Sequence, residues 1–145
     1  MRDDVCTNRD TSPWYTFEDF DPRAWPLDGI RWTYLVAPST GSTAFEMGIC
    51  RLGAGERHLL HHHRRRSELY YVTAGQALVT IGEQTFEAGP GDAFNIPAGV
   101  SHGYRTVGDE VFEIVFVYDQ PLGLERPDTF WDVDLDALRA ERGLG

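Results

Sequence analysis

The sequence predicts a single all-β domain, either a sandwich or a barrel, with an extension at each end. Six short segments rich in β-branched and aromatic residues are separated by clusters of Gly, Pro and Ser, a pattern typical of many strands joined by turns. The chain has 145 residues, of which 41% are hydrophobic, which is enough for one domain with its own core. No run approaches the roughly 20 apolar residues of a membrane-spanning helix.

Residues 1–29 are expected to form an arm outside the barrel. Five aromatic residues alternate there with Asp and Pro: Trp14, Tyr15, Phe17, Phe20 and Trp25. The prolines argue against a long helix, and aromatic side chains gain free energy when they leave water. Two interpretations stay open: an arm that packs on the barrel or on a partner subunit, and a lid that contributes to a pocket.

Residues 30–119 are expected to form the barrel. The expected strands are Ile30–Ala37, Ala44–Leu52, Glu68–Thr73, Ala77–Ile81, Ala93–Ile96 and Val111–Tyr118. In the last of them both faces are mostly apolar, which is typical of a strand buried on both sides.

Residues 120–145 form the C-terminal extension, which begins with a Pro/Gly-rich turn. A short helix is expected over Asp134–Arg142. Asp134 is a suitable N-cap because its carboxylate can accept a hydrogen bond from a free backbone N–H of the first turn. Gly143 stands where the helix should stop, since glycine readily adopts the conformation that ends a helix.

The charge balance argues against nucleic acid as a partner. The chain carries 23 acidic and 13 basic residues, a formal charge of −10, whereas phosphate binding needs a net basic face. All the basic residues are Arg, so Schiff-base chemistry through Lys is excluded. Cys6 and Cys50 are a poor framework for a disulfide. Since no signal-peptide pattern is present, we expect a cytoplasmic protein that does not associate with membranes.

Three adjacent histidines and a following glutamate form the first candidate metal motif. In a strand, side chains two residues apart share a face, so His61 and His63 point the same way and His62 points away. Glu68 follows five residues later, far enough to return beside them on the next strand. Imidazole nitrogens and a carboxylate oxygen suit a divalent transition metal, one of Fe, Mn, Ni, Zn or Cu.

His102 offers a fourth ligand. It follows Pro97 and Gly99, which mark a turn between strands, and it begins an aromatic stretch. Three buried histidines and a buried glutamate without a metal would be costly. We therefore expect one divalent metal bound by His61, His63, Glu68 and His102.

Both segments resemble the two motifs of the cupin superfamily. The first fits G-x5-HxH-x4-E-x6-G as Gly55, His61, His63, Glu68 and Gly75. The second fits G-x5-PxG-x2-H-x3-N as Gly91, Pro97, Gly99 and His102, with Thr106 in place of the final Asn, which is not a ligand in the family. The resemblance covers about residues 30–118. It implies a double-stranded β-helix, or jelly-roll barrel, with the ligands pointing inward, and a homodimer.

Several residues near these motifs are candidates for contact with a ligand. Alternation from Glu68 and His102 places Tyr70 and Tyr104 on the metal-facing side, as candidate catalytic groups for proton transfer; the alternative is that they fill the barrel. His58 could support a ligand or contact a substrate. The run Arg64–Arg66 is interpreted as a solvated loop, with an anion contact at the barrel mouth as the alternative.

Three function classes stay open, because the fold hosts many reactions. The first is a metal-dependent lyase or isomerase of a small, anionic organic molecule, with a metal-stabilised enolate and a Tyr as acid or base. For this class, Glu68-x-Tyr70 and residues 29–32 resemble the small cupin lyases that split dimethylsulfoniopropionate. The second is an Fe(II) cupin dioxygenase. The third is a non-catalytic cupin that binds a metal or a small molecule.

Overall fold

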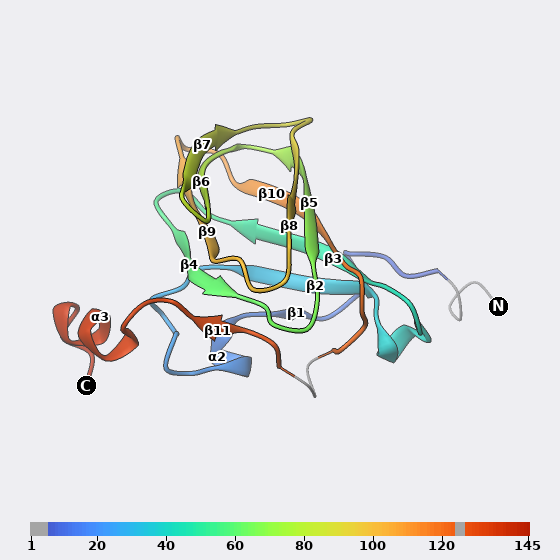
Figure 1. Ribbon diagram of the computed structural model, residues 1–145, viewed down its shortest axis with the longest axis horizontal. Helices are drawn as coiled ribbons and strands as arrows, with labels where there is room; N and C mark the ends of the chain where they lie inside the picture. The colour runs from blue at the N-terminus through green and yellow to red at the C-terminus, as the bar shows by residue number, and fades with distance from the viewer. Residues whose placement is uncertain (1–5, 124–126) are drawn as a thin grey trace.

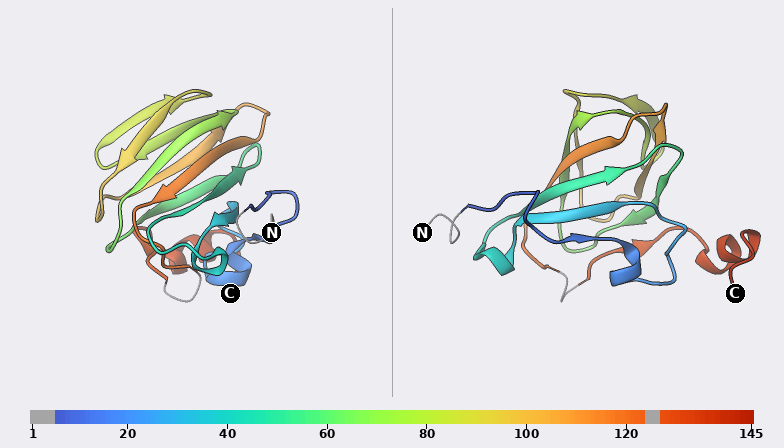
Figure 2. Two further views of the ribbon diagram at one scale, coloured as in Figure 1. Left: turned by 90° about the vertical axis from the view of Figure 1, so that its right-hand side faces the viewer. Right: turned by 180° about the vertical axis from the view of Figure 1, so that it is seen from behind.

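The computed structural model describes residues 6–123 and 127–145 and contains two antiparallel sheets that enclose one interior (Figures 1 and 2). The larger sheet contains, in spatial order, β1 (Trp14–Tyr15), β2 (Arg31–Val36), β3 (Glu46–Leu52), β10 (Phe112–Tyr118), β5 (Glu68–Ala74) and β8 (Ala93–Ile96). The smaller sheet contains β11 (Phe130–Trp131), β4 (Arg57–His62), β9 (His102–Val107), β6 (Gln76–Ile81) and β7 (Gln84–Ala88). Most neighbours in space are distant in sequence, so the predicted all-β jelly roll is confirmed.

All six expected strands are present, with ends that shift by one or two residues. β3, for example, begins at Glu46 rather than at Ala44. Of the strands outside these six, β4 and β9 carry histidines of the two motifs, and those that the sequence did not indicate are the short polar β7 and the two-residue strands β1 and β11. The last two exist only because they pair with strands distant in sequence, β2 and β4.

The core lies between the sheets and follows the alternation of each strand. On β5, Glu68, Tyr70 and Val72 are buried, whereas Leu69 and Tyr71 are exposed. The expectation for β10 was wrong in part. Its inner face is buried, but its outer face is only half-buried, because nothing in the described part of the chain covers that side of the sheet as fully as the second sheet covers the inner side.

The N-terminal arm packs on its own barrel. β1 pairs with β2, and the short helix α2 (Phe17–Phe20) follows it. Thr16 caps this helix, since its hydroxyl accepts from the backbone N–H of Glu18 at 3.2 Å and satisfies a donor of the first turn. The side chain of Phe17 is buried in the core. The arm therefore extends the larger sheet and contributes to the hydrophobic core.

The C-terminal extension also returns to the barrel, where β11 pairs with β4. It ends in helix α3 (Leu135–Glu141), and Asp134 accepts a hydrogen bond from the N–H of Ala137 at 3.0 Å. The predicted C-terminal helix and its cap are confirmed. A single-turn 3-10 helix (Pro38–Thr40) completes the elements.

The two extensions meet at one end of the barrel, where α2 and β11 lie close together (Figure 1). The indole Nε1 of Trp131 donates to Asp21 Oδ2 at 2.8 Å, and its ring packs edge-on against Phe17 at 4.9 Å between centroids. The arm and the C-terminal extension thus form one wall. None of the helices in the described part of the chain has the length and apolar character needed to cross a membrane.

Candidate metal centre

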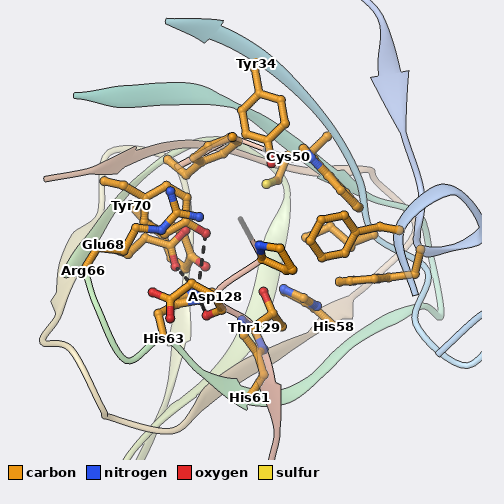
Figure 3. A pocket seen from close by; sticks show the side chains of 18 residues that line it. Tyr34, Cys50, His58, His61, His63, Arg66, Glu68, Tyr70, Asp128 and Thr129 are labelled. Atoms are coloured by element: carbon orange, nitrogen blue, oxygen red, sulfur yellow. Dashed lines mark hydrogen bonds and ion pairs between the residues drawn. The ribbon is translucent and has the colours of Figure 1, made fainter. Parts of the chain in front are cut away.

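The structure brings the four predicted ligands together at one end of the barrel interior. His61 lies on β4, opposite His102 at the start of β9, and His63 follows the end of β4. The three histidines offer nitrogens that all lie within 4.8 Å of one another. Glu68, the first residue of β5, places Oε1 3.3 Å from His63 Nε2 and 3.2 Å from His102 Nε2. Figure 3 shows His61, His63 and Glu68 gathered on one side of a cavity.

A backbone carbonyl oxygen fixes each of the three rings. His61 Nδ1 donates to Leu59 O at 2.6 Å, His63 Nδ1 to Asp128 O at 2.8 Å and His102 Nδ1 to Val100 O at 2.9 Å. A carbonyl oxygen can only accept, so each Nδ1 carries the hydrogen and each Nε2 keeps a lone pair in the neutral ring. Metal-binding histidines are held in this way by outer hydrogen bonds.

Among the residues that the structure describes, two buried polar atoms at the centre have no hydrogen-bond partner: Glu68 Oε1 and His102 Nε2. They lie 3.2 Å apart, but neither supplies a hydrogen when the carboxyl is ionised and the ring is held by Val100. Unpaired buried polar atoms are costly, and a cation between them removes the cost. This pair of atoms is the observation that best fits the site to a metal.

The pKa shifts of His61 and Glu68 also fit a metal site. Burial, with further contributions from His102, His58 and His63, holds the pKa of His61 well below its usual value. Burial alone would raise the pKa of Glu68, but the contacts with His102 and His63 outweigh it and hold that pKa well below its usual range. A neutral imidazole and an ionised carboxylate are the forms that bind metals. Three histidines and one glutamate suit a divalent transition ion.

The cluster opens on a cavity with many aromatic side chains in its walls. Phe17 and Phe20 come from the arm, Trp32 and Tyr34 from β2, and Phe116 and Tyr118 from β10. The space open to the centre of a water molecule is about 60 Å³, room for several waters. His61, His63 and Glu68 line the cavity, and His102 lies behind them. The arm therefore both packs on its own barrel and contributes side chains to the pocket, so the two interpretations hold together.

Of the two candidate tyrosines, Tyr70 reaches the cavity and Tyr104 does not. Burial, followed by the charge of Glu68, raises the pKa of Tyr70 well above its usual value, so its hydroxyl stays protonated and acts as a donor. The Tyr104 hydroxyl is buried and has no hydrogen-bond partner among the described residues. The centroid of its ring lies 5.9 Å from that of Tyr70 and 5.3 Å from that of His58. That position corresponds to the alternative in which Tyr104 fills the barrel.

The interpretation of Arg64–Arg66 as a solvated loop is wrong for Arg66. Its side chain is only 6% exposed, and its Nη1 bonds Glu46 Oε2 at 2.6 Å. The guanidinium lies 3.5 Å above the ring of Tyr118 and lines the cavity. Arg66 stands two residues before Glu68, so alternation extended backwards from the glutamate could have indicated its inward direction.

Sequence reasoning also missed Asp28, the partner of His58. Asp28 Oδ2 lies 2.6 Å from His58 Nδ1, and both side chains are buried. The pairing of β4 with β9 shifts register between His58 and His61. Such an irregularity breaks simple alternation, so both histidines, three residues apart, line the same cavity.

The sequence and the fold have counterparts among known proteins. The cupin domain family matches residues 48–118. Protein SchB of Streptomyces halstedii is 35% identical over 101 residues, which cover 69% of this chain and 72% of SchB. "Polyketide synthase CurC" of Streptomyces cyaneus is 33% identical over 84 residues, 58% of this chain, and the match spans only 54% of CurC.

Among solved structures, the polyketide cyclase RemF of Streptomyces resistomycificus superposes with a TM-score of 0.70. The identity is 19%, and the superposition covers 94% of this chain and 91% of RemF. This likeness concerns the fold, including the two extensions. The chain belongs to the cupin superfamily.

Proposed function

We propose that the protein is a metal-dependent enzyme that performs enolate chemistry, as a lyase, isomerase or cyclase, on a small carbonyl compound. The observation that carries the proposal is the shared cavity: the open side of the His/Glu cluster and the neutral hydroxyl of Tyr70 face the same aromatic-walled space. The names of two similar proteins, the polyketide synthase CurC and the polyketide cyclase RemF, support a ketone-bearing substrate.

His61, His63, Glu68 and His102 would bind the ion. A divalent ion bound there supplies a Lewis acid, which polarises a carbonyl and stabilises negative charge on its oxygen. The chain's own contribution begins with Tyr70, whose protonated hydroxyl can donate to a ligand oxygen in the cavity. The surrounding aromatic side chains lower the local dielectric constant and so strengthen each polar contact inside.

The buried Arg66 supports a ligand with an electron-rich oxygen rather than a full negative charge. It is tied to Glu46 at 2.6 Å, so the pair is close to neutral overall. Two of the hydrogen bonds made by its guanidinium go to Glu46 and Gln120, both through Nη1. The positive end of the cavity wall is therefore fixed in place beside Glu68 and Tyr118.

Tyr70→Phe is expected to slow proton exchange next to a ketone by about 100- to 10,000-fold, the usual contribution of one acid–base group. The probe is 4-oxopentanoate in D2O with the zinc- or manganese-loaded protein, followed by proton NMR. Tyr71→Phe is the matched control, because Tyr71 is the next residue and points outward with 48% exposure.

Equal exchange in wild type and Tyr70→Phe would refute the role of Tyr70. Absence of any exchange by the fully loaded wild type would refute enolate chemistry on this class of ketone. Oxygen uptake by the iron-loaded protein with the same probe would instead favour the dioxygenase.

We also propose that the protein forms a homodimer through the outer face of the larger sheet. Adjacent apolar side chains lie on this face across three paired strands: the exposed Leu69 and Tyr71 and the partly buried Met47, Val115 and Val117. Leu69 and Tyr71 are 46% and 48% exposed. Exposed apolar patches of this kind typically mark protein interfaces.

Leu69→Glu is expected to convert a dimer into a monomer, because a charge buried in an apolar interface has no partner. Light scattering coupled to size exclusion should change from twice 16.4 kDa to the mass of one chain. Val107→Glu, at a 37% exposed position on the other sheet, should leave the mass unchanged. A wild type that already runs as a monomer would contradict the proposal.

A further inference from the structure

His58 lies in the cavity wall beside the metal centre without belonging to it, and its partner is the buried Asp28. The side chains are 8% and 0% exposed, and His58 Nδ1 lies 2.6 Å from Asp28 Oδ2. The same carboxylate accepts from the backbone N–H groups of Leu59 at 2.8 Å and Ile30 at 3.0 Å. The two backbone hydrogen bonds hold the Asp28 carboxylate in place, and the carboxylate in turn holds the imidazole of His58.

This contact determines which nitrogen of His58 is available. A carboxylate accepts, so the hydrogen of the neutral ring lies on Nδ1, and Nε2 is left as an acceptor. Nε2 has no hydrogen-bond partner among the residues that the structure describes. Unlike His102 Nε2 and Tyr104 Oη, it is not fully buried. Since His58 lines the cavity, this acceptor is open to a ligand.

Packing fixes the position of the ring. The centroid of His58 lies 4.2 Å from that of His61, 5.3 Å from that of Tyr104 and 6.0 Å from that of Phe17. Figure 3 shows His58 on the opposite side of the cavity from Glu68 and Arg66. The acceptor is therefore rigid, and it stands next to a metal ligand.

We propose that the His58–Asp28 pair is a hydrogen-bond-accepting subsite for a hydroxyl group of the ligand. It rests on the proposed function and narrows the substrate class to carbonyl compounds that carry an alcoholic or enolic O–H a few bonds from the carbonyl. The carbonyl oxygen then lies toward the His/Glu cluster, and the hydroxyl donates to His58 Nε2. A ligand without the hydroxyl leaves this acceptor desolvated and unpaired, which lowers affinity.

Two isosteric probes test the subsite directly: hydroxyacetone and butanone, which differ by O–H against CH3. Their dissociation constants can be measured by titrating the histidine ring 15N signals of the zinc-loaded protein. The wild type should bind hydroxyacetone about 10- to 100-fold more tightly, the range for an unpaired buried acceptor. In the same spectra, His58 should carry its hydrogen on Nδ1.

His58→Asn should abolish this preference while zinc binding is retained. Its amide N–H can replace Nδ1 and donate to Asp28, but nothing replaces the Nε2 acceptor. Asp28→Ala is the second variant, for use if His58→Asn does not fold, and it should reduce the preference because no carboxylate then holds the ring hydrogen on Nδ1. Asp132→Ala is the matched control, since Asp132 holds Nδ1 of His62 at 2.9 Å, which lies on the same strand as His58 but faces outward, and the preference should be unchanged.

Equal affinity of the wild type for the two probes would overturn the proposal, and so would a ring hydrogen on Nε2 of His58. The exchange experiment with 4-oxopentanoate uses a ketone without a hydroxyl. Loss of exchange with the hydroxyl preference intact would therefore refute the enolate function alone. Exchange without any hydroxyl preference would refute the subsite alone.

Discussion

Glu68→Gln is expected to remove tight metal binding and to leave the metal-free protein as stable as the wild type or more stable. Glu68 is the negative charge among the four ligands, and its Oε1 lies within 3.3 Å of His63 Nε2 and His102 Nε2. A neutral amide loses the attraction for a cation. Its N–H can instead donate to the lone pair of a histidine, which satisfies atoms that are otherwise unpaired.

The zinc affinity should fall while the stability of the metal-free protein should not, and both can be measured on one sample. Competition with a chelator should show a loss of zinc affinity greater than the roughly 100-fold that removal of an outer partner causes. Added zinc should raise the Tm of the wild type but not that of the variant. Glu113→Gln is the control, because Glu113 pairs with Arg51 at 2.7 Å outside the cluster. Unchanged zinc affinity in Glu68→Gln would remove Glu68 from the ligand set.

Asp128→Ala is expected to lower zinc affinity by about 10- to 100-fold, although Asp128 is not a ligand. Its carbonyl oxygen orients His63 at 2.8 Å. Its carboxylate, which is almost fully buried, accepts from the backbone N–H groups of Arg64 at 3.1 Å and Arg65 at 3.0 Å. Without the carboxylate, these N–H groups lose their partner, and the contact that aligns His63 loosens.

The variant should also lower the free energy of unfolding, by about 1 kcal/mol for each of the two hydrogen bonds lost, because both N–H groups are only partly buried. Asp132→Ala is a matched control: it removes another aspartate of the C-terminal extension that contacts a histidine of the same run, His62. Competition with a chelator should give a lower zinc affinity for Asp128→Ala than for Asp132→Ala. Equal zinc affinities would mean that the C-terminal extension does not position His63.

The ligand set could be predicted from the sequence because it depends on a local rule. Alternation along a strand places His61 and His63 on one face, and it places Tyr70 beside Glu68 with Tyr71 turned out. The structure agrees at each of these positions. Helix α3 could also be predicted from the sequence, because its cap, Asp134, directly precedes it in the chain.

The rest of the site depends on contacts between residues that are distant in the sequence. Asp28 meets His58 across 30 residues and Asp128 meets His63 across 65, and no local pattern indicates either contact. His58 faces the cavity because the register of β4 shifts, which alternation alone cannot foresee. Strands β1 and β11 are only two residues long, so their pairing partners, rather than their own sequences, make them strands.

Elemental analysis of the untagged protein tests the central claim most directly. The claim is that His61, His63, Glu68 and His102 hold one divalent ion, as their converging atoms indicate. We expect about one metal ion per chain in the wild type and none in His61→Ala purified alongside. If neither protein binds metal after reloading with Fe, Mn, Ni, Zn and Cu, the cluster is not a metal site and the proposed chemistry is wrong.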